Sequence, residues 1–233
     1  MGRFNLSPYI REEIIFFIPA RGGSKSIKKK NLVRIKNLPL IGYTLECLKK
    51  LNFLNKTYVS TDCNEIKSFV KKYDVNIHNR SKSLSRDKTK TSEVIRSFLE
   101  DFKIKDSNSI LILQPTSPLR SKEDIINAIK LFLKYKKITI ISANRCPWSF
   151  LKCSFKIINK KPKYLFKTNN GIRRQDLEEI YVINGAIYLF SIKNFKKNNY
   201  EIPKNFEPYY MPYYRGFDLD DYDDLRLIKK LVN

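Results

Sequence analysis

Short runs of apolar residues alternate with longer amphipathic stretches along most of this chain. Four runs rich in Ile, Val or Leu, each bounded by polar turns, lie at 14–18, 57–60, 110–113 and 138–142. Runs of this length and composition are typical of strands that are buried on both faces of a sheet. A further strand-like stretch covers 181–190. The pattern therefore predicts a sheet of mostly parallel strands.

Helical periodicity fills the intervals between these runs. Amphipathic helices are predicted over 40–48, 66–73, 94–102 and 223–232. Ser121, followed by acidic residues in the first turn, predicts another helix that continues to about Tyr135. The alternation of strands and helices indicates an α/β fold, in which helices cover both faces of a mostly parallel sheet.

The pattern weakens between 145 and 182. This segment is rich in Lys and Asn and contains turn signals at 160–162 and 169–171. It is too long for a plain connection within a compact domain. We therefore expect residues 1–233 to form a single domain with an inserted arm over about 145–182, which could serve as a lid or as an assembly element.

Composition narrows the class of protein. Hydrophobic residues make up 42% of the chain, which excludes a disordered chain. No apolar run approaches the roughly 20 residues that span a bilayer, and the first residues lack the apolar stretch of a secretory signal. We therefore expect a cytoplasmic protein without a membrane partner. The chain has no Cys-x-x-Cys pair and a single histidine, which argues against a zinc site.

The formal net charge is +23, which invites the idea of a nucleic-acid partner. The lysines are spread among Asn and Ile instead of forming one tract, so a solvated, lysine-rich surface accounts for the charge without such a partner. A positive field would also favour the capture of small anionic substrates. Charge alone therefore does not separate nucleotide chemistry from RNA binding, and nucleic acid is not the partner that we expect.

Polar segments follow directly after three of the predicted strands. They are a Gly-Gly turn with two cations (Arg21, Gly22, Gly23, Ser24 and Lys25), then 61–62 and 114–120. Because ligands bind where the carboxyl ends of parallel strands share one edge, we expect these loops to form one site. Backbone amides and cations around a flexible turn suit the polyphosphate of a nucleotide or sugar nucleotide. A tight turn with a solvated basic tail would fit the first loop as well.

Two carboxylates near the end of the chain could hold a metal ion. Asp218 and Asp220 are two residues apart, so in an extended segment their side chains point to the same face. Oxygen ligands of this kind suit Mg²⁺, which would bridge phosphate oxygens while Arg21 and Lys25 share in neutralising them. The alternative is that these acids are solvated and cap the last helix. That interpretation suits the acids after Asp220 better than it suits Asp218 and Asp220.

Several segments form an ordered set that covers nearly the whole chain. They are 18–25 with Lys30 and Asn31, 39–44, 59–62, 113–120, 174–177, 184–188 and 218–220. In this order they resemble the acylneuraminate cytidylyltransferases, a family that makes CMP-activated sialic acids and related nonulosonic acids. The resemblance implies a Rossmann-like nucleotidyltransferase fold, CTP as a substrate, Mg²⁺ as a cofactor, and a homodimer in which the arm reaches toward the neighbouring active site.

The resemblance also implies roles for individual residues. The residues expected to bind CTP are Arg21, Gly22, Ser24, Lys25, Lys30, Asn31, Arg80 and Thr91. Those expected to bind the sugar acid are Gln114 and Gln175 and, across the dimer, Lys152 and Arg174. Those expected to carry catalysis are Arg21, Lys25, Asp218 and Asp220. The two aspartates would hold Mg²⁺, and Asp220 would also help to activate the sugar hydroxyl.

The chain departs from the family pattern at three places. The segment 28–30, which is three lysines, usually contains a proline, so the shape of this loop would differ. Val182 stands where an arginine is common, which bears on the identity of the acid. The usual Asp-Thr-x-Ser-Ser run is Asp-Lys-Thr-Lys-Thr at 87–91, in which Thr91 keeps the final hydroxyl.

The expected reaction is the transfer of CMP from CTP to the anomeric hydroxyl of a nonulosonic acid, with release of pyrophosphate. Positioning and charge neutralisation would carry the catalysis, without a covalent enzyme intermediate. Two alternatives remain open. The acceptor could be the eight-carbon acid 3-deoxy-manno-octulosonate, or the fold could serve a non-catalytic protein that binds anions or RNA.

Overall fold

The computed structural model of this protein describes residues 14–166, 173–176 and 178–232. Its strands are β1 (Ile14–Pro19), β2 (Arg34–Ile35), β3 (Leu38–Pro39), β4 (Thr57–Thr61), β5 (Asn76–Asn79), β6 (Ser109–Leu113), β7 (Thr139–Arg145), β8 (Phe155–Ile158), β9 (Lys161–Tyr164), β10 (Tyr181–Ser191) and β11 (Phe206–Tyr210). Its helices are α2 (Leu40–Lys50), α3 (Asn64–Val70), α4 (Thr91–Asp101), α5 (Lys122–Lys134), α6 (Trp148–Cys153), α7 (Ile192–Lys197) and α8 (Tyr222–Leu231). Short 3-10 helices are η1 (Lys30–Leu32), η2 (Leu54–Lys56), η3 (Lys71–Tyr73), η4 (Ser83–Ser85) and η5 (Arg174–Asp176).

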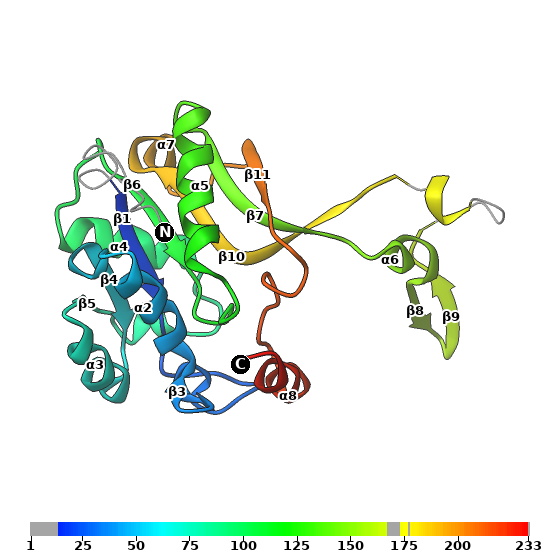
Figure 1. The fold of residues 1–233 in the computed structure, drawn as a ribbon, viewed down its shortest axis with the longest axis horizontal. Helices are drawn as coiled ribbons and strands as arrows, with labels where there is room; N and C mark the ends of the chain where they lie inside the picture. Colours follow the sequence, from blue (N-terminus) through cyan, green and yellow to red (C-terminus); the bar gives the residue numbers. More distant parts are fainter. Residues whose placement is uncertain (1–13, 167–172, 177, 233) are drawn as a thin grey trace.

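One seven-stranded sheet, in the order β11-β7-β10-β6-β1-β4-β5, forms the centre of the molecule (Figure 1). β1 pairs in parallel with β4 and β6, β4 with β5, and β7 with β11. β10 runs antiparallel to both β6 and β7. The strands and the mostly parallel sheet that the sequence predicts are confirmed. The apolar pattern does not predict β5 or β11, which are the two edge strands.

Helices cover both faces of the sheet, because successive side chains of β1 point to opposite faces. Phe16 packs with apolar side chains of α2, α3 and α5 on one face. Phe17 packs with Phe98 of α4 and Phe195 of α7 on the other face. All four rings are at most 1% exposed, and burying each one stabilises the fold by about 1.5–3 kcal/mol. The apolar stripes that predict the helices are thus their core-facing sides.

The segment between β7 and β10 projects from the body of the molecule (Figure 1). The ends of β7 and β10 remain paired there, with Arg145 opposite Tyr181, and they lead into α6, the hairpin β8–β9 and η5. The hairpin turns at Asn159 and Lys160, whose φ angles of 51° and 62° suit a tight hairpin turn. This turn overlaps the turn signal at 160–162, whereas the signal at 169–171 lies outside the described residues.

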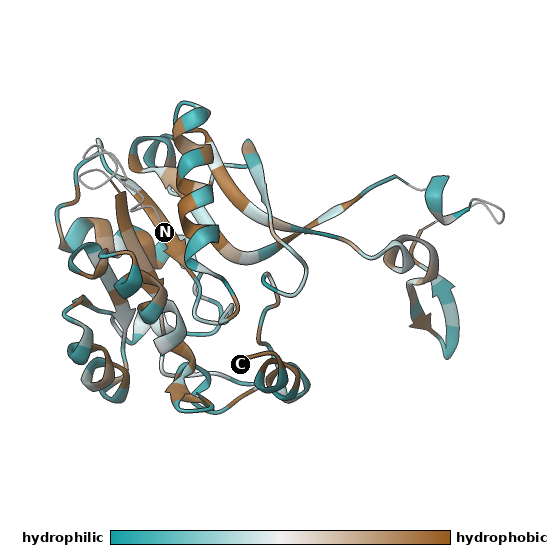
Figure 2. Ribbon diagram, viewed as in Figure 1, coloured by the Kyte–Doolittle hydropathy of each residue, from teal (hydrophilic) through white to brown (hydrophobic). Residues whose placement is uncertain are grey.

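The hairpin β8–β9 carries large apolar side chains that the described residues of this chain leave exposed to solvent. Phe155 is 54% exposed, Ile157 is 63% exposed and Tyr164 is 64% exposed. Figure 2 shows β8 as a hydrophobic strand far from the hydrophobic centre of the sheet. Large exposed apolar patches of this kind mark interaction surfaces.

The helix α8 packs beside the loop that follows β1. Leu225 and Ile228 of α8 form a buried cluster with Ile27, Ile35 and Leu219. This packing brings the last part of the chain next to the loop that carries the N-terminal cations.

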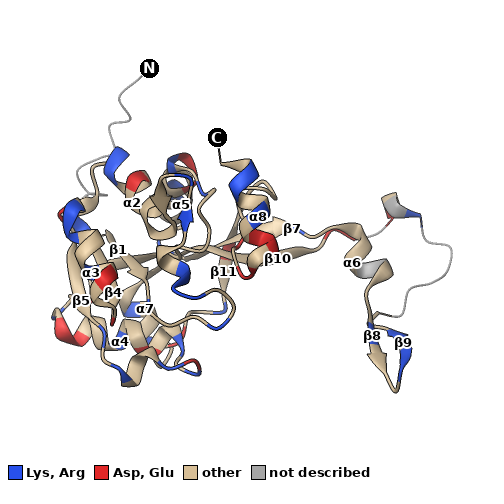
Figure 3. Ribbon diagram, turned by 90° about the horizontal axis from the view of Figure 1, so that it is seen from below, with Lys and Arg blue, Asp and Glu red and all other residues tan. Residues whose placement is uncertain are grey.

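Lysine and arginine residues lie on most helices and loops of the body and on β9 of the arm (Figure 3). Within the described part of the chain, no helix combines the length and the apolar character needed to cross a membrane.

Candidate active site

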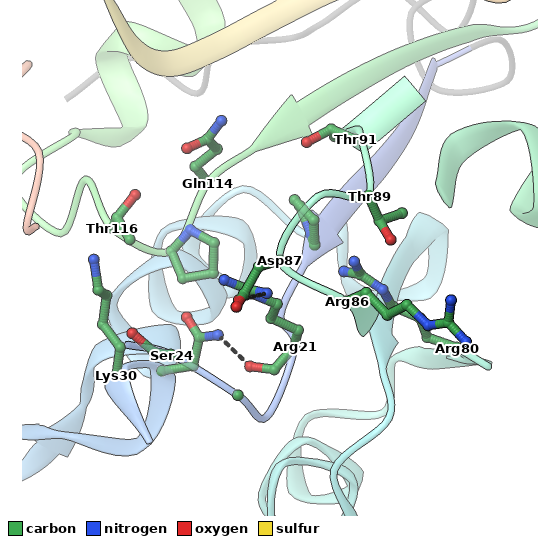
Figure 4. A pocket seen from close by; sticks show the side chains of 14 residues that line it. Arg21, Ser24, Lys30, Arg80, Arg86, Asp87, Thr89, Thr91, Gln114 and Thr116 are labelled. Atoms are coloured by element: carbon green, nitrogen blue, oxygen red, sulfur yellow. Dashed lines mark hydrogen bonds and ion pairs between the residues drawn. The ribbon is translucent and has the colours of Figure 1, made fainter. Parts of the chain in front are cut away.

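A cavity of about 270 Å³ opens where β1 and β6 end (Figure 4). Three loops line it: the loop after β1, the loop between β5 and α4, and the loop after β6. The lining residues are Pro19, Arg21, Gly23, Ser24, Lys30, Asn31, Arg80, Arg86, Asp87, Thr89, Thr91, Gln114, Pro115 and Thr116. Loops that are far apart in the sequence therefore meet at one edge of the sheet.

Neighbouring segments hold the loop after β1 in place. Nδ2 of Asn31 donates to the carbonyl of Arg21 at 2.9 Å, and the N–H of Gly22 donates to Oδ1 of Asp62 at 2.8 Å. A Cβ on Gly22 would lie 2.7 Å from a side chain of the loop after β4, so this close approach requires glycine. The sequence suggests that the backbone amides of this loop are available to a polyphosphate. In the structure the amide of Gly22 is instead already paired with Asp62.

Asp87 places a carboxylate among the cations of this cavity. Its Oδ1 lies 2.7 Å from Nη1 of Arg21, and its Oδ2 lies 2.9 Å from Nζ of Lys25. Hydrogen bonds from Lys25 and then Arg21 hold the pKa of Asp87 below its ordinary value. Figure 4 shows Asp87 beside Arg21 in the lining. Two cations that the sequence assigns to a triphosphate therefore hold an anion of the protein itself.

The loop between β5 and α4 contributes two arginines with different surroundings. Arg80 is 9% exposed, and its Nε donates to the carbonyl of Leu84 at 2.9 Å, while burial lowers the pKa of its guanidinium. Arg86 lies beside Arg80 in Figure 4. Its carbonyl accepts from the N–H of Thr89 at 3.1 Å, but within the described part of the chain its guanidinium has no hydrogen bond or ion pair. Arg80 therefore shapes the loop, and Arg86 presents a cation to the cavity.

The segment before α8 brings the C-terminal carboxylates to the N-terminal cations. Leu219 is fully buried, its N–H donates to the carbonyl of Thr116 at 2.8 Å, and its carbonyl accepts from Nζ of Lys30 at 2.9 Å. The same Nζ lies 3.2 Å from Oδ1 of Asp220. The hydroxyl of Ser26 also donates to the carbonyl of Asp220. The loop after β1 and the segment before α8 thus meet at one place.

Asp218 is partly buried, and burial is the main reason that the pKa of its carboxyl is raised; the nearby charge of Asp220 adds to this. Its Oδ1 has no partner with good hydrogen-bond geometry among the described residues, and neither has the buried hydroxyl of Thr116. Thr116 nevertheless lies close enough to lower the pKa of Asp218 and so to oppose part of the effect of burial. A buried oxygen without a partner is costly unless a cation or donor meets it. Asp221 and Asp224 have a different role, because they cap α8.

A second cavity, of about 630 Å³, shares Gln114 with the first. It is lined by the outer parts of β7 and β10, by the start of the arm and by the segment before α8. Its lining residues are Gln114, Asn144, Arg145, Cys146, Pro147, Phe150, Val182, Ile183, Asn184, Gly185, Tyr188, Tyr213, Gly216, Phe217, Asp218 and Asp220.

Paired amides form one wall of the second cavity. Nδ2 of Asn184 donates to Oδ1 of Asn144 at 2.8 Å, and Nδ2 of Asn144 donates to the carbonyl of Met211 at 2.8 Å. The hydroxyl of Ser142 donates to Oδ1 of Asn184 at 2.5 Å. Gly216 packs directly on these groups, since a Cβ there would lie 2.2 Å from both amides. This wall is therefore closely packed and internally hydrogen-bonded.

The structure brings most of the predicted site residues together. Those that line the first cavity are Arg21, Ser24, Lys30, Asn31, Arg80, Thr91 and Gln114, and those that line the second are Gln114, Asp218 and Asp220. Gly22 and Lys25 line neither cavity, although Lys25 reaches the first through Asp87. Gln175 lies in η5 on the arm and lines neither cavity. The side chains of Lys152 and Arg174 lie outside the part that the structure describes.

The structure adds lining residues that the sequence analysis does not assign to the site. They are chiefly Arg86, Asp87, Thr89 and Thr116 in the first cavity, and Asn144, Arg145, Asn184, Tyr188 and Tyr213 in the second. A signal existed for Thr116, which follows a predicted strand, and for Asp87 and Thr89, which belong to the polar run at 87–91. Arg145 and Tyr213 carry no such signal, because they lie at the edges of the predicted elements.

One protein family matches most of the chain. Its model, described as Cytidylyltransferase, covers residues 15–208. The chain belongs to the cytidylyltransferase family. A cytidylyltransferase needs room for a nucleoside triphosphate, and a cavity with cations and threonine hydroxyls at the carboxyl edge of the sheet suits that ligand.

Relatives with similar sequences support one branch of this cytidylyltransferase family. The chain is 29% identical to the post-translational flagellin modification protein B of Campylobacter coli, over 94% of this chain and 95% of that protein. It is 27% identical to the N-acylneuraminate cytidylyltransferase of Escherichia coli O18:K1:H7, over 94% of this chain but about half (52%) of that protein. It is 26% identical to the pseudaminic acid cytidylyltransferase of Campylobacter jejuni, over 92% of this chain and 94% of that protein. The resemblance to acylneuraminate cytidylyltransferases is thus confirmed.

Solved structures show the same fold. The chain is similar to CMP:2-keto-3-deoxy-manno-octonic acid synthetase complexed with CTP, with a TM-score of 0.69, 14% identity, and coverage of 94% of this chain and 98% of that one. This likeness confirms the Rossmann-like nucleotidyltransferase fold.

Proposed function

We propose that this cytidylyltransferase transfers CMP from CTP to the anomeric hydroxyl of a nonulosonic acid. The observation that carries the proposal is the contact between Lys30 of the first cavity and Asp220 of the second. Gln114 also lines both cavities. The cation-lined cavity would hold the triphosphate, and the larger cavity would hold the acid. The reacting groups would then meet where the cavities join.

The proposed reaction is an in-line displacement at phosphorus. The anomeric oxygen forms a bond to the α-phosphorus of CTP, the bond from that phosphorus to the bridging oxygen breaks, and pyrophosphate leaves with the bonding electrons. The hydroxyl proton passes to solvent through Asp220, the exposed carboxylate of the pair. Arg21, Lys25 and Lys30 would neutralise the charge that develops on the phosphates, so catalysis rests on positioning and electrostatics.

Asp218 and Asp220 are the residues that would hold Mg²⁺. The buried Oδ1 of Asp218 has no partner with good hydrogen-bond geometry among the described residues, which fits an oxygen that a cation meets in the loaded enzyme. Within the described part of the chain no cluster of three or more His, Cys, Asp and Glu could hold a metal. Mg²⁺ suits this small set, because it is usually held by one or two carboxylates together with substrate phosphates and water. When bound, the ion would offset phosphate charge.

The relatives favour a nonulosonic acid as acceptor, and the acid that we propose is of the N-acetylneuraminic or legionaminic type. Proteins named for N-acylneuraminate and pseudaminic acid are 26–27% identical to this chain. The alternative acceptor is 3-deoxy-manno-octulosonate, which the fold likeness to the octonic acid synthetase favours. That likeness comes with 14% identity, so the sequence relatives carry more weight for the substrate.

The proposal includes a homodimer that acts in the cytoplasm, where CTP is available. The exposed apolar side chains of the hairpin support an arm that packs on a second copy of the chain. In such a dimer Lys152, Arg174 and Gln175 of one arm would reach the acid in the other subunit. This placement accounts for the position of Gln175, which lies on the arm and outside both cavities of its own subunit.

The direct test is the release of pyrophosphate from CTP and Mg²⁺ in the presence of a panel of nonulosonic acids, with 3-deoxy-manno-octulosonate as the competing acceptor. We expect turnover with at least one nonulosonic acid, a CMP-acid product that can be identified by ³¹P NMR, and loss of turnover when the metal is chelated. Faster turnover with the eight-carbon acid would favour that alternative. Absence of pyrophosphate with every acid, together with salt-sensitive RNA binding, would overturn the proposal in favour of a non-catalytic protein.

A further inference from the structure

The second cavity has a single cation among its described lining residues, Arg145. It lies at the end of β7, opposite Tyr181 of β10, and its side chain is 69% exposed. The carboxylates of the cavity, Asp218 and Asp220, belong to the segment before α8. The positive and negative groups of this cavity therefore come from different parts of the fold.

Arg145 is held in place from the side of the arm. Its Nη2 lies 2.7 Å from Oε1 of Glu179, and the other carboxylate oxygen of Glu179 accepts a hydrogen bond from the hydroxyl of Tyr181 at 2.8 Å. The ring of Tyr181 packs against Tyr210, with 4.6 Å between ring centroids. Tyr181 and Tyr210 thus brace Glu179, and Glu179 braces the guanidinium.

The ion pair with Glu179 leaves part of the guanidinium available. An arginine side chain has five N–H donors in a planar fork, and the guanidinium of Arg145 has no further hydrogen bond or ion pair within the described ranges. A second carboxylate can therefore bind to the remaining donors. Fork-to-carboxylate pairing of this kind is strong and selects for a planar, charged group.

The other charged and amide side chains of the cavity are poor partners for a carboxylate, and its two tyrosines, Tyr188 and Tyr213, are neutral. The amides of Asn144 and Asn184 are bonded to each other and to neighbouring groups. Asp218 and Asp220 would repel a second negative charge. Gln114 is neutral and also lines the first cavity. Of the lining residues whose side chains are described, Arg145 is thus the group that can neutralise a carboxylate.

We propose that Arg145 binds the carboxylate of the acid substrate, and that Glu179 is a positioning residue that orients its guanidinium. The inference rests on the proposed function and deepens it, because it names the residue that makes the second cavity select for an acid. Arg145 would hold the carboxylate of the substrate at the end of β7. The negative charge of the acid would then point away from Asp218 and Asp220, which would face the phosphates of CTP.

The test compares the free nonulosonic acid that turns over best with its methyl ester, which is neutral at the same position. We measure kcat/KM for both substrates in the wild-type enzyme, in Arg145→Gln and in Arg145→Lys. Arg96→Gln is the matched control, because Arg96 is an exposed arginine of α4 that pairs with Glu100 and lines neither cavity. The KM for CTP is measured in parallel.

In Arg145→Gln we expect the preference for the free acid over the ester to fall by about 10- to 100-fold, the range for a lost charge-assisted hydrogen bond. The KM for CTP should not change, and Arg145→Lys should keep part of the preference, because it keeps the charge without the fork. Arg96→Gln should keep all of it.

An unchanged preference in Arg145→Gln, or an equal loss for acid and ester, would overturn the inference and leave the proposed function standing. Absence of pyrophosphate release by the wild-type enzyme with every acid would overturn the proposed function, and the inference with it.

Discussion

Asp87 links two cations of the loop after β1, Arg21 and Lys25. It accepts from Arg21 at 2.7 Å and from Lys25 at 2.9 Å, so in this structure its carboxylate competes with any phosphate for the same donors. We expect Asp87→Asn to lower the Kd for CTP and for inorganic pyrophosphate by a few-fold, because exposed ion pairs of this kind contribute little individually. Isothermal titration calorimetry measures both constants.

The control for Asp87→Asn is Asp106→Asn. Asp106 also pairs with a lysine, Lys196, at 2.6 Å, but it lines neither cavity, so the Kd for CTP should not change. Weaker binding of CTP in Asp87→Asn would show that this carboxylate takes part in binding the nucleotide, and would contradict the competition that we infer.

The residues of the site could be predicted where a simple rule of chain geometry applies. Asp220 is a candidate because it belongs to an extended pair of acids, whereas the role of Lys30 is implied by the family resemblance. The two side chains are 3.2 Å apart. Arg145 could not be assigned in this way, and the polar run that contains Asp87 does not indicate that its carboxylate pairs with Arg21 and Lys25. Their role depends on which side chains of other elements lie opposite them, and periodicity carries no information about that.

The elements could be predicted best where both faces of a strand are buried. β1 and β6 are continuous apolar runs, because helices cover both sides of the central strands. β5, with the sequence Asn-Ile-His-Asn, and β11, which contains Pro208, are edge strands with fewer buried positions, so they lack that signal. The antiparallel direction of β10 follows from the return path of the arm, which local sequence does not determine.

Three elements, β4, β5 and α4, are joined by the only histidine of the chain. Nδ1 of His78 on β5 lies 2.9 Å from the hydroxyl of Ser60 on β4, and Nε2 lies 3.0 Å from Oδ2 of Asp101 at the end of α4. The ring is 1% exposed, and burial lowers the pKa of His78 below its ordinary value of 6.5, although Asp101 acts in the opposite direction.

We expect the burial of His78 to make the fold less stable in mild acid. Below about pH 6.5 the unfolded chain takes up a proton that buried His78 resists, so the free energy of unfolding should fall as the pH is lowered from about 7 toward 5. The one histidine resonance in the NMR spectrum should titrate with a midpoint below 6.5. In His78→Gln the urea-unfolding free energy should depend less on pH in this interval. A midpoint above 6.5 would contradict the prediction.

In the proposed dimer, the arm joins two copies of the chain. Ile157 is 63% exposed in the hairpin, and we expect it to be buried against a second copy of the chain. Ile157→Lys should shift the molar mass in light scattering from a dimer toward a monomer, because burying an unpaired charge is costly. Leu133→Lys on α5, where the leucine is 40% exposed, is the control and should leave the mass unchanged. A monomeric wild-type chain would contradict the proposed dimer.

The fold as a whole brings cations near the start of the chain and carboxylates near its end to one cleft, and the account depends on both acting on the same CTP. The most direct measurement is the Mg²⁺ dependence of pyrophosphate release in Asp218→Asn, with Asp223→Asn as the control at an exposed carboxylate of α8. We expect Asp218→Asn to lose roughly 100-fold or more in turnover, together with its response to Mg²⁺. It should unfold at the same or a higher urea concentration, because burial disfavours the ionised form of Asp218. Unchanged turnover and metal response in Asp218→Asn would contradict the account.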